Sequence, residues 1–417
     1  MGIMKPATIL SRIGIVFSDI LIPAREINLK KWAIIACDQF TSDSAYWDRV
    51  DRTVGEAPST LHLILPEIHL LRDGSVHQET HIRRTMEQYL DDGTLKSLPD
   101  SGVFVRRTLQ NGTIRRGLVV ALDLEQYDYH PGSDAIIRAS EETIPDRLPP
   151  RAAIRRGASL ETPHVLVLYQ DEQDRLNSIL DDASGKLNRL YQTALMEGGG
   201  SVEGFQVSLT GSLANGIAAT LEEIAQETME QYQFVFATGD GNHSLAAAWS
   251  VWQERKAQGA PEDDPYRYCL VELVNVFDPG MPFHPIHRVV RAPRDRVLRY
   301  LQEHQGTGSE HLTIAAAGHD DHVLSLPDEG PMAVALVDEM VDELGVSVDY
   351  VHGEAEAREA AEAVAGCALL FTEFPREQLY RTVAERGTLP RKAFSLGEAR
   401  DKRYYLECRS LRALTDQ

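Results

Sequence analysis

Apolar and polar positions along this chain follow two different periods. Short apolar runs, several of them rich in β-branched residues, have the length of strands, and they predict strands at residues 32–37, 61–65, 103–107, 118–124, 164–169, 234–238, 269–277 and 333–337. Between these runs, apolar residues spaced three to four apart predict amphipathic helices at residues 44–54, 80–91, 173–197, 214–232, 244–256, 295–303 and 355–364. The two kinds of segment alternate, and this alternation predicts an α/β fold of the mixed α+β type.

The length of the chain sets how many lobes it can form. With 417 residues, 43% of them hydrophobic, it can bury more than one core. We expect a multi-lobed single chain without internal repeats. Its main α/β body covers residues 1–300 and can be subdivided near 130–160. A C-terminal α/β lobe, residues 301–417, returns the loop at 389–395 to the site in the main body.

The charge balance argues against two classes of partner. The chain has 63 acidic and 42 basic residues and a net charge of −21, so it repels nucleic acid and anionic membranes. A small anionic metabolite or nucleotide stays a candidate partner, because a local basic pocket can reverse the field within about 8 Å. No apolar run is long enough to span a bilayer, and we expect a cytoplasmic protein. A homo-oligomer is left open.

Metal-binding patterns are weak. The four cysteines form no CxxC pair, which predicts neither a zinc site nor a disulfide framework. His284 and His287 have a spacing that can bind metal on a helix, but Pro285 separates them and no third ligand stands out. We therefore expect no structural zinc, and neither haem nor flavin.

A glycine-containing turn is the sharpest local feature. An apolar strand at 234–238 runs through a short polar segment into an alanine-rich helix, and the segment consists of Gly239, Asp240, Gly241, Asn242, His243 and Ser244. Glycines permit a tight turn and close approach of a ligand, and a helix start offers amide groups and a positive dipole to an anion. The alternative is an ordinary turn in which Asn242 caps the helix. The polar side chains at 240, 243 and 244 favour a phosphate or nucleotide site.

An arginine-rich segment lies at residues 138–156, where five arginines occur in this acidic chain. Arg147 and Arg151 are candidates to clamp a phosphate bidentately. Glu141 could orient them, bind Mg²⁺ or act as a base. A solvated face of surface salt bridges is the alternative interpretation.

Three shorter stretches add candidates. The strand at 32–37 delivers Cys37 and Asp38 to its end; we expect a buried, inert cysteine, and Asp38 is a candidate acid, base or metal ligand. The stretches at 283–288 and 389–395 could be plain loops, but they could also bind phosphate. Their candidate phosphate ligands are His287, Arg288, Arg391, Lys392 and Ser395.

These stretches together resemble, over nearly the whole chain, the domain of unknown function 1015 family. The resemblance rests on Tyr46, Trp47 and residues 32–42, 57–61, 118–129, 137–143, 146–151, 239–244, 283–288 and 389–399. The turn at 239–244 is also similar to the phosphate-binding signature of the ParB/sulfiredoxin superfamily, which includes free-serine kinases. Asp240, Gly241 and His243 match that signature, whereas Asn242 and Ser244 depart from it. The family itself implies no established activity.

The superfamily resemblance implies a nucleotide-dependent phosphotransferase that uses ATP or ADP with Mg²⁺. Its acceptor would be a small hydroxylated metabolite, with serine or a related amino acid as the candidate. Asp38, Glu141, Asp240 and His243 are the candidate catalytic residues, and Glu141 or Asp240 would hold the Mg²⁺. A hydrolase of phosphorylated metabolites and a non-catalytic nucleotide- or metabolite-binding regulator remain open alternatives.

Overall fold

The computed structural model describes residues 4–69, 75–327 and 332–412, and it divides the chain into two compact units. The first unit comprises Met1–Met281, Leu379–Thr388 and Gly397–Gln417, and the second comprises Pro282–Gln378 and Leu389–Leu396. The chain therefore leaves the first unit at Pro282 and again at Leu389, and it returns at Leu379 and at Gly397. The division at residue 300 expected from the sequence stays a prediction about domains.

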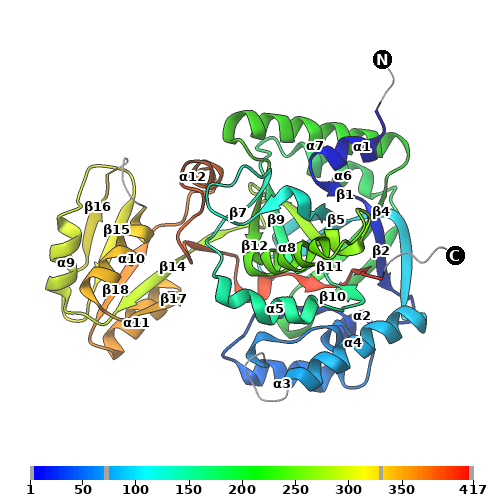
Figure 1. Ribbon diagram of the computed structural model, residues 1–417. Helices are drawn as coiled ribbons and strands as arrows, with labels where there is room; N and C mark the ends of the chain where they lie inside the picture. Colours follow the sequence, from blue (N-terminus) through cyan, green and yellow to red (C-terminus); the bar gives the residue numbers. More distant parts are fainter. Residues whose placement is uncertain (1–3, 70–74, 328–331, 413–417) are drawn as a thin grey trace. The chain divides into compact units, whose positions relative to one another are not determined.

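A large mixed sheet forms the centre of the first unit (Figure 1). Within the described residues its main path runs β6 (Tyr127–Asp128), β7 (Ile137–Ala139), β12 (Phe236–Asp240), β9 (Val165–Tyr169), β13 (Tyr268–Asn275), β5 (Ile114–Asp123), β4 (Leu95–Thr108), β2 (Ser18–Pro23), β21 (Cys408–Ser410) and β8 (Leu160–Glu161). Three more strands join it, with β1 (Ile15–Val16) on β5, β11 (Ser201–Ser208) on β4 and β10 (Arg189–Ala194) on β11.

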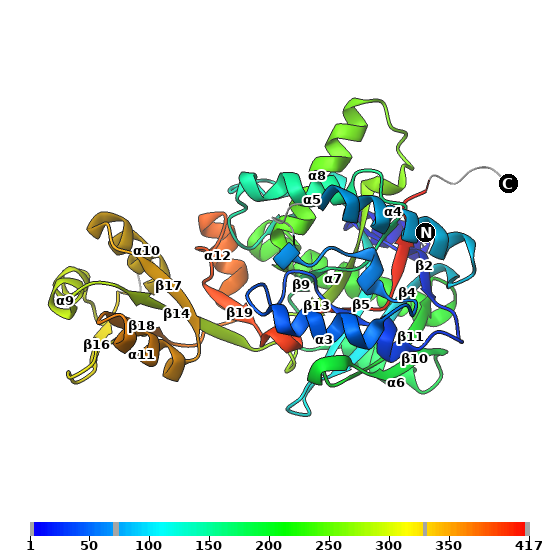
Figure 2. The ribbon, with the colours of Figure 1, turned by 90° about the horizontal axis from the view of Figure 1, so that it is seen from below.

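Helices cover this sheet. They are α1 (Pro6–Arg12), α2 (Leu29–Trp32), α3 (Ser44–Val54), α4 (Ser75–Asp91), α5 (Leu148–Arg155), α6 (Arg175–Ser184), α7 (Gly211–Tyr232), α8 (Asn242–Ala257) and, from its second residue, α12 (Gln378–Arg386). Short 3₁₀ helices are η1 (Thr60–Leu63), η2 (Glu67–His69), η3 (Leu124–Gln126), η4 (Pro145–Arg147), η5 (Met196–Gly198), η6 (Pro265–Arg267) and η7 (Ala399–Asp401). Helices α5 and α8 lie side by side (Figures 1 and 2). None of the helices in the described ranges is long and apolar enough to cross a membrane.

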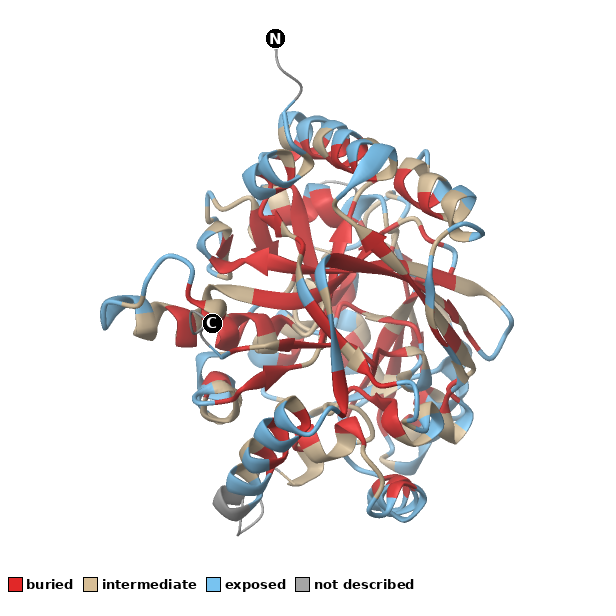
Figure 3. Cartoon of the chain, turned by 90° about the vertical axis from the view of Figure 1, so that its right-hand side faces the viewer, coloured by how far each residue is buried: buried red, intermediate tan, exposed pale blue. Residues whose placement is uncertain are grey.

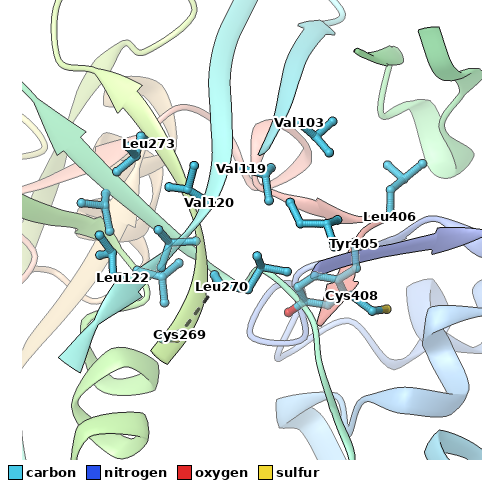
Figure 4. Close-up of a cluster of buried hydrophobic side chains, with 14 of the residues drawn as sticks. Val103, Val119, Val120, Leu122, Cys269, Leu270, Leu273, Tyr405, Leu406 and Cys408 are labelled. Atoms are coloured by element: carbon cyan, nitrogen blue, oxygen red, sulfur yellow. Dashed lines mark hydrogen bonds between the residues drawn. The ribbon is translucent and has the colours of Figure 1, made fainter. Parts of the chain in front are cut away.

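The core of the first unit lies between the sheet and these helices. Val119, Val120 and Leu122 of β5 gather with Leu270 and Leu273 of β13 (Figure 4), and all five side chains are almost completely buried. Burial of each such side chain contributes roughly 1.5–3 kcal/mol. The strands are mostly buried and the outer faces of the helices exposed (Figure 3). The sheet is therefore a rigid platform for residues at its edge.

The C-terminal segment ties the N-terminal one to this platform. Strand β20 (Tyr404–Tyr405) pairs with β3 (Ile34–Ile35), and the Trp32 indole N–H donates to the carbonyl oxygen of Leu406 at 2.9 Å. Arg403 is buried and forms ion pairs with two buried carboxylates, Glu272 and Glu407. Buried charges need such partners. This network fixes the backbone next to Lys402 and Tyr405, two residues of the site described below.

The second unit has its own sheet. Its strand order in the described residues is β16 (His322–Ser325), β15 (His311–Ala315), β18 (Cys367–Phe371), β14 (Phe283–Val290) and β17 (Val348–His352), and β19 (Phe394–Leu396) also pairs with β14. Its helices are α9 (Arg294–Gln302), α10 (Ala333–Leu344) and α11 (Glu354–Ala363). Helix α11 packs on β18 and β14.

The mixed α/β fold predicted from the sequence is confirmed. Four predicted elements are wrong in type or extent. Residues 61–65 lie mainly in the 3₁₀ helix η1, residues 333–337 begin the helix α10, and the helix predicted at 173–197 stops at Ser184 and gives way to β10. Of the strand predicted at 32–37, only Ile34–Ile35 is extended in a ladder.

Candidate active site

The turn between β12 and α8 depends on a glycine. Gly241 has a φ of +81°, which residues with a side chain rarely adopt. A Cβ at this position would lie 3.0 Å from Cδ2 of His164 and 3.3 Å from Cα of Val165. The turn therefore packs directly against the start of β9, and the predicted strand–glycine–helix element is confirmed.

Asp240 links this turn to the C-terminal segment. Its Oδ1 accepts a hydrogen bond from the N–H of Gly241 at 3.0 Å, and its Oδ2 lies 3.2 Å from the Nζ of Lys402. The Lys402 side chain is only 10% exposed, so the ion pair is largely shielded from water. The carboxylate is thereby held at the start of α8.

Three neighbours of Asp240 make different contacts. Helix α8 begins at Asn242, so its cap residue is Gly241 and not Asn242, and the Oδ1 of Asn242 accepts from the N–H of Ser140 at 3.2 Å. His243 Nε2 accepts from the N–H of Ile144 at 3.2 Å, so the proton of a neutral ring sits on Nδ1. A Cβ at Gly239 would lie 2.8 Å from Leu168, and close packing on β9 therefore requires this glycine as well.

A carboxylate–imidazole pair lies beside the turn. Asp38 Oδ1 accepts from Nε2 of Gln39 at 2.8 Å, and Asp38 Oδ2 lies 3.5 Å from Nε2 of His164. His164 Nδ1 is 2.6 Å from the hydroxyl oxygen of Tyr405, which also accepts from the backbone N–H of Cys37 at 3.0 Å. These contacts form a chain of polar groups from Asp38 through His164 to Tyr405.

The charges of this pair follow from its surroundings. Burial on its own would raise the pKa of Asp38, but His164, Gln39 and Lys402 together bring that pKa below its ordinary value. Burial would lower the pKa of His164, yet Asp38 raises it well above the ordinary value for histidine. Burial, with Cys37 and Asp38 nearby, raises the pKa of Tyr405 well above its usual range. At neutral pH the site therefore holds a carboxylate, an imidazolium and a neutral phenol.

A cavity of about 160 Å³ opens next to these groups, and every residue that lines it belongs to the first unit. Its polar lining residues are Cys37, Arg151, Arg155, Glu161, Thr162, His164, Ser244 and Tyr405. Most of the remaining lining is aliphatic. Cys37 is half-buried, not buried as expected, and its side chain belongs to a cavity wall together with that of His164.

The arginines at 138–156 divide into different environments. Arg138 donates to the carbonyl oxygens of Ala135 and Gln233, and Arg156 makes an exposed bidentate pair with Glu254. Arg151 lines the cavity and pairs with Glu67 at 2.9 Å. Arg147 is exposed in η4, and Arg155 pairs with Glu161 at 2.5 Å. Glu141, the candidate carboxylate of the same segment, is half-buried after β7.

The other predicted phosphate ligands belong to the second unit. Arg288 is fully buried, and its guanidinium donates to the carbonyl oxygens of Ile286, Arg391 and Lys392 at 2.7–3.0 Å. His287 Nδ1 accepts from the N–H of Phe371 at 3.2 Å, and burial lowers the pKa of His287, so its ring is neutral. Ser395, on β19, pairs in register with His284. All of these residues lie in one small sheet and its flanking loop.

Three residues of the site were missed by sequence reasoning. His164 is the single polar residue at the start of an apolar run, which is a weak signal because strands often begin with a polar residue. Lys402 and Tyr405 lie more than 160 residues from Asp240 and His164 along the chain, so no local pattern could connect them. Asp38, Asp240, Gly241, Ser244 and Arg151 were predicted, and the structure brings them to this site or its cavity.

A second cavity of the first unit, about 480 Å³, contains none of the predicted site residues. His62, His69 and His81 line it together with Asp48 and Asp51. Within the described ranges, no three His, Cys, Asp or Glu side chains are grouped so that they could hold a metal ion.

Comparisons with known proteins give one family and several distant structures. Similar solved structures include a conserved hypothetical protein from Pyrococcus furiosus (10% identity, TM-score 0.34, covering 70% of this chain and 94% of that one). SbnI with a C-terminal truncation, from Staphylococcus aureus, has 10% identity and a TM-score of 0.36 and covers 67% and 82%. A free serine kinase in complex with AMP has 11% identity and a TM-score of 0.33 and covers 66% and 86%. Likenesses this distant carry no argument about activity.

Sequence comparison places the chain more firmly. No curated protein sequence matches it. Residues 19–351, well over half of the chain, match the family described as "Protein of unknown function (DUF1015)". The motifs that resemble this family, from the segment at 32–42 to the turn at 239–244, supply Asp38, Asp240 and Gly241 of the site. The chain belongs to the DUF1015 family.

Proposed function

We propose that this protein is a nucleotide-dependent phosphotransferase that acts on a small hydroxylated metabolite. The observation that carries the proposal is the pairing of two carboxylates with two cations at the start of α8, Asp38 with His164 and Asp240 with Lys402. Phosphoryl transfer requires mainly positioning of the reactants and neutralisation of charge. Groups of both signs, held by buried partners, suit that task.

Asp38 is the residue that would receive the proton of the acceptor hydroxyl. Its lowered pKa keeps it ionised at neutral pH, so it can accept a hydrogen bond from a hydroxyl group. Gln39 contacts one oxygen of Asp38 and His164 contacts the other, and these two contacts orient the carboxylate. The His164 imidazolium balances its charge before an anionic reactant arrives.

The start of α8 and Lys402 would bind the phosphates. The first turn of a helix presents amide groups and a positive dipole to an anion. Gly241 permits the positive φ on which this turn depends, and the Nζ of Lys402 lies at the same turn. His287 and Arg288 are not part of the proposed site, because protein acceptors and donors already engage them.

The donor set also fits a nucleotide with Mg²⁺. Mg²⁺ is usually bound by one or two carboxylates together with phosphate oxygens and waters. Asp240 is the carboxylate nearest the phosphate-binding turn, and Glu141 is the second candidate. A bound ATP or ADP would supply the phosphoryl group, with the chain's own residues positioning the acceptor.

A specific observation favours a metabolite over water as the acceptor. The cavity of about 160 Å³ beside His164 and Cys37 is several times the volume of a water molecule, about 30 Å³. A hydrolase of the nucleotide itself would use the same charged groups without needing this space. Serine or a related amino acid is the acceptor that the resemblance of the glycine turn implies.

The test is nucleotide consumption by matched variants. We expect purified protein with ATP or ADP, Mg²⁺ and a pool of hydroxylated amino acids and hydroxy acids to consume nucleotide. Asp38→Asn should lower the rate by roughly 100-fold or more. Asp263→Asn, an exposed carboxylate in the loop after α8, is the control and should keep the wild-type rate.

Two results would contradict the proposal. One is the absence of nucleotide consumption with every acceptor, together with tight nucleotide binding, which would favour the regulatory binder. The other is an Asp38→Asn variant as active as wild type. Nucleotide consumption that does not depend on any added acceptor would indicate hydrolysis of the nucleotide itself.

A further inference from the structure

We propose that the cavity beside Cys37 binds the hydrocarbon body of the acceptor, and that the acceptor is a small hydroxy acid with a branched or ring-shaped apolar part. This inference rests on the proposed phosphotransfer, because it identifies the substrate class of the same site. Three properties of the cavity support it: its volume, the chemistry of its walls and the charges at its edge.

The volume limits what can enter. An apolar protein cavity of about 150 Å³ holds a molecule the size of benzene. The cavity here is about 160 Å³, so it fits a body of about six carbon atoms and is too small to enclose a whole nucleotide. The nucleotide phosphates therefore belong at the turn before α8, and the cavity belongs to the acceptor.

The walls select an apolar body. Aliphatic side chains dominate them, including Leu65, Met86, Ile154, Ala158, Leu160 and Leu411. Serine has one methylene group and would leave most of this space unfilled. Because each methylene group in an apolar pocket changes specificity roughly 10- to 200-fold, a branched acid should bind far better than serine.

The charged residues of the lining select an anion. Arg151, Arg155 and the His164 imidazolium lie on the lining. Each has a carboxylate partner, Glu67, Glu161 and Asp38 respectively, and only Glu161 of these partners also lines the cavity. Arg151 donates to Glu67 and to the carbonyl oxygen of Arg147, which leaves donors of its five N–H groups for a second carboxylate. A ligand carboxylate suits this side of the cavity.

The remaining polar residues place the hydroxyl. Cys37, His164 and Tyr405 lie together on the lining, and Asp38 follows Cys37 directly and pairs with His164. A hydroxy acid held by its carboxylate at Arg151 and by its apolar body in the cavity could turn its hydroxyl towards Asp38. The three parts of the ligand thus correspond to three parts of the site.

Cys37 provides a direct measure of whether the cavity is occupied. It is half-buried on the lining, whereas Cys269, Cys367 and Cys408 are buried. We expect iodoacetamide to label Cys37 first, and α-hydroxyisocaproate, the branched hydroxy acid related to leucine, to slow that labelling. Serine should require at least a tenfold higher concentration for the same protection. The absence of protection by α-hydroxyisocaproate, or equal protection by serine, would overturn the proposal.

Matched variants test the two parts of the cavity separately. Ala247→Leu fills the cavity and should weaken α-hydroxyisocaproate binding at least tenfold in calorimetry, whereas Ala257→Leu, exposed at the end of α8, should not. If Ala247→Leu does not fold, Arg151→Gln serves instead, with the exposed Arg156→Gln as its control. Unchanged affinity in Arg151→Gln would overturn the carboxylate assignment.

The outcome also separates this inference from the proposed function. Binding of α-hydroxyisocaproate in the cavity without nucleotide consumption supports the cavity assignment and contradicts phosphotransfer. Nucleotide consumption with serine, and none with α-hydroxyisocaproate, supports phosphotransfer and overturns the substrate class proposed here.

Discussion

At the scale of single residues, Asp38 and His164 act as one titrating pair. Asp38 raises the pKa of His164 well above its value of about 6.5 in an unfolded chain. The folded state therefore holds a proton that the unfolded state releases. Because the pKa of Asp38 is lowered, the pair's stabilisation is complete between about pH 3.9 and 6.5, the ordinary pKa values of the two groups. It is lost as the pH rises through the raised pKa, by up to about 1.4 kcal/mol per pH unit.

This linkage predicts a difference between wild type and Asp38→Asn. Urea unfolding between pH 6 and 9 should show the wild-type free energy falling more steeply with pH than that of the variant, because an amide does not raise the pKa of His164. The gap between the two curves should narrow as the pH rises. If the free energies of unfolding of the two proteins depend on pH in the same way, Asp38 does not raise the pKa of His164.

The same residues show what can be predicted from the sequence. Asp38 and Asp240 were predicted because each follows an apolar strand, and polar residues at strand ends form sites in α/β proteins. Lys402 and Tyr405 were not, because only the pairing of β20 with β3 and the buried network around Arg403 bring them to the site. Contacts between distant segments leave no period or spacing in the sequence.

At the scale of elements, the turn from β12 to α8 depends on Gly241. We expect Gly241→Ala to destabilise the protein for two reasons, a positive φ and contacts at 3.0 and 3.3 Å with His164 and Val165. The positive φ costs about 1–2 kcal/mol, and overpacking adds roughly 1–3 kcal/mol. Nucleotide affinity should fall as well, because the turn would move.

A matched glycine separates the cost of the positive φ from the cost of overpacking. Gly112, in the turn between β4 and β5, has a φ of +84°, and no atom lies within 4 Å of the position that an alanine Cβ would take there. Gly112→Ala should therefore show only the backbone cost in chemical denaturation. If Gly112→Ala and Gly241→Ala lose the same free energy of unfolding, packing of the turn against β9 adds nothing to the cost at Gly241.

Most elements were predicted well, and the errors lie where an apolar run suits both a strand and a helix or where a break inside a period was overlooked. Helix α3 (Ser44–Val54) has its predicted ends, and β9 was predicted within one residue. The run at 333–337 has five apolar residues, which suit a strand or one side of a helix equally, and it forms the start of α10. The helix predicted through 173–197 overlooked Gly185, where α6 ends.

At the scale of the whole molecule, the chain forms two units with separate sheets. Composition predicted more than one core but could not give the boundary, because no linker-like segment marks it. The second unit is formed by Pro282–Gln378 together with a short return, Leu389–Leu396, whose strand β19 pairs with β14. Such a return depends on strand pairing, which local sequence does not encode.

This division predicts where a ligand slows hydrogen exchange. ATP with Mg²⁺ and α-hydroxyisocaproate, at about 100 times their dissociation constants, should stabilise the unit that binds them by about 2.7 kcal/mol each. Because the proposed site and its cavity belong to the first unit, amides of β9, β12 and the first turn of α8 should exchange more slowly by up to 100-fold per ligand. Amides of β15 and β18 in the second unit should keep their rates.

Slower exchange at 389–396 as well would support the phosphate-binding role predicted for Arg391, Lys392 and Ser395. Unchanged exchange at the start of α8 would contradict the phosphate-binding turn, since a bound anion must protect the amides it contacts.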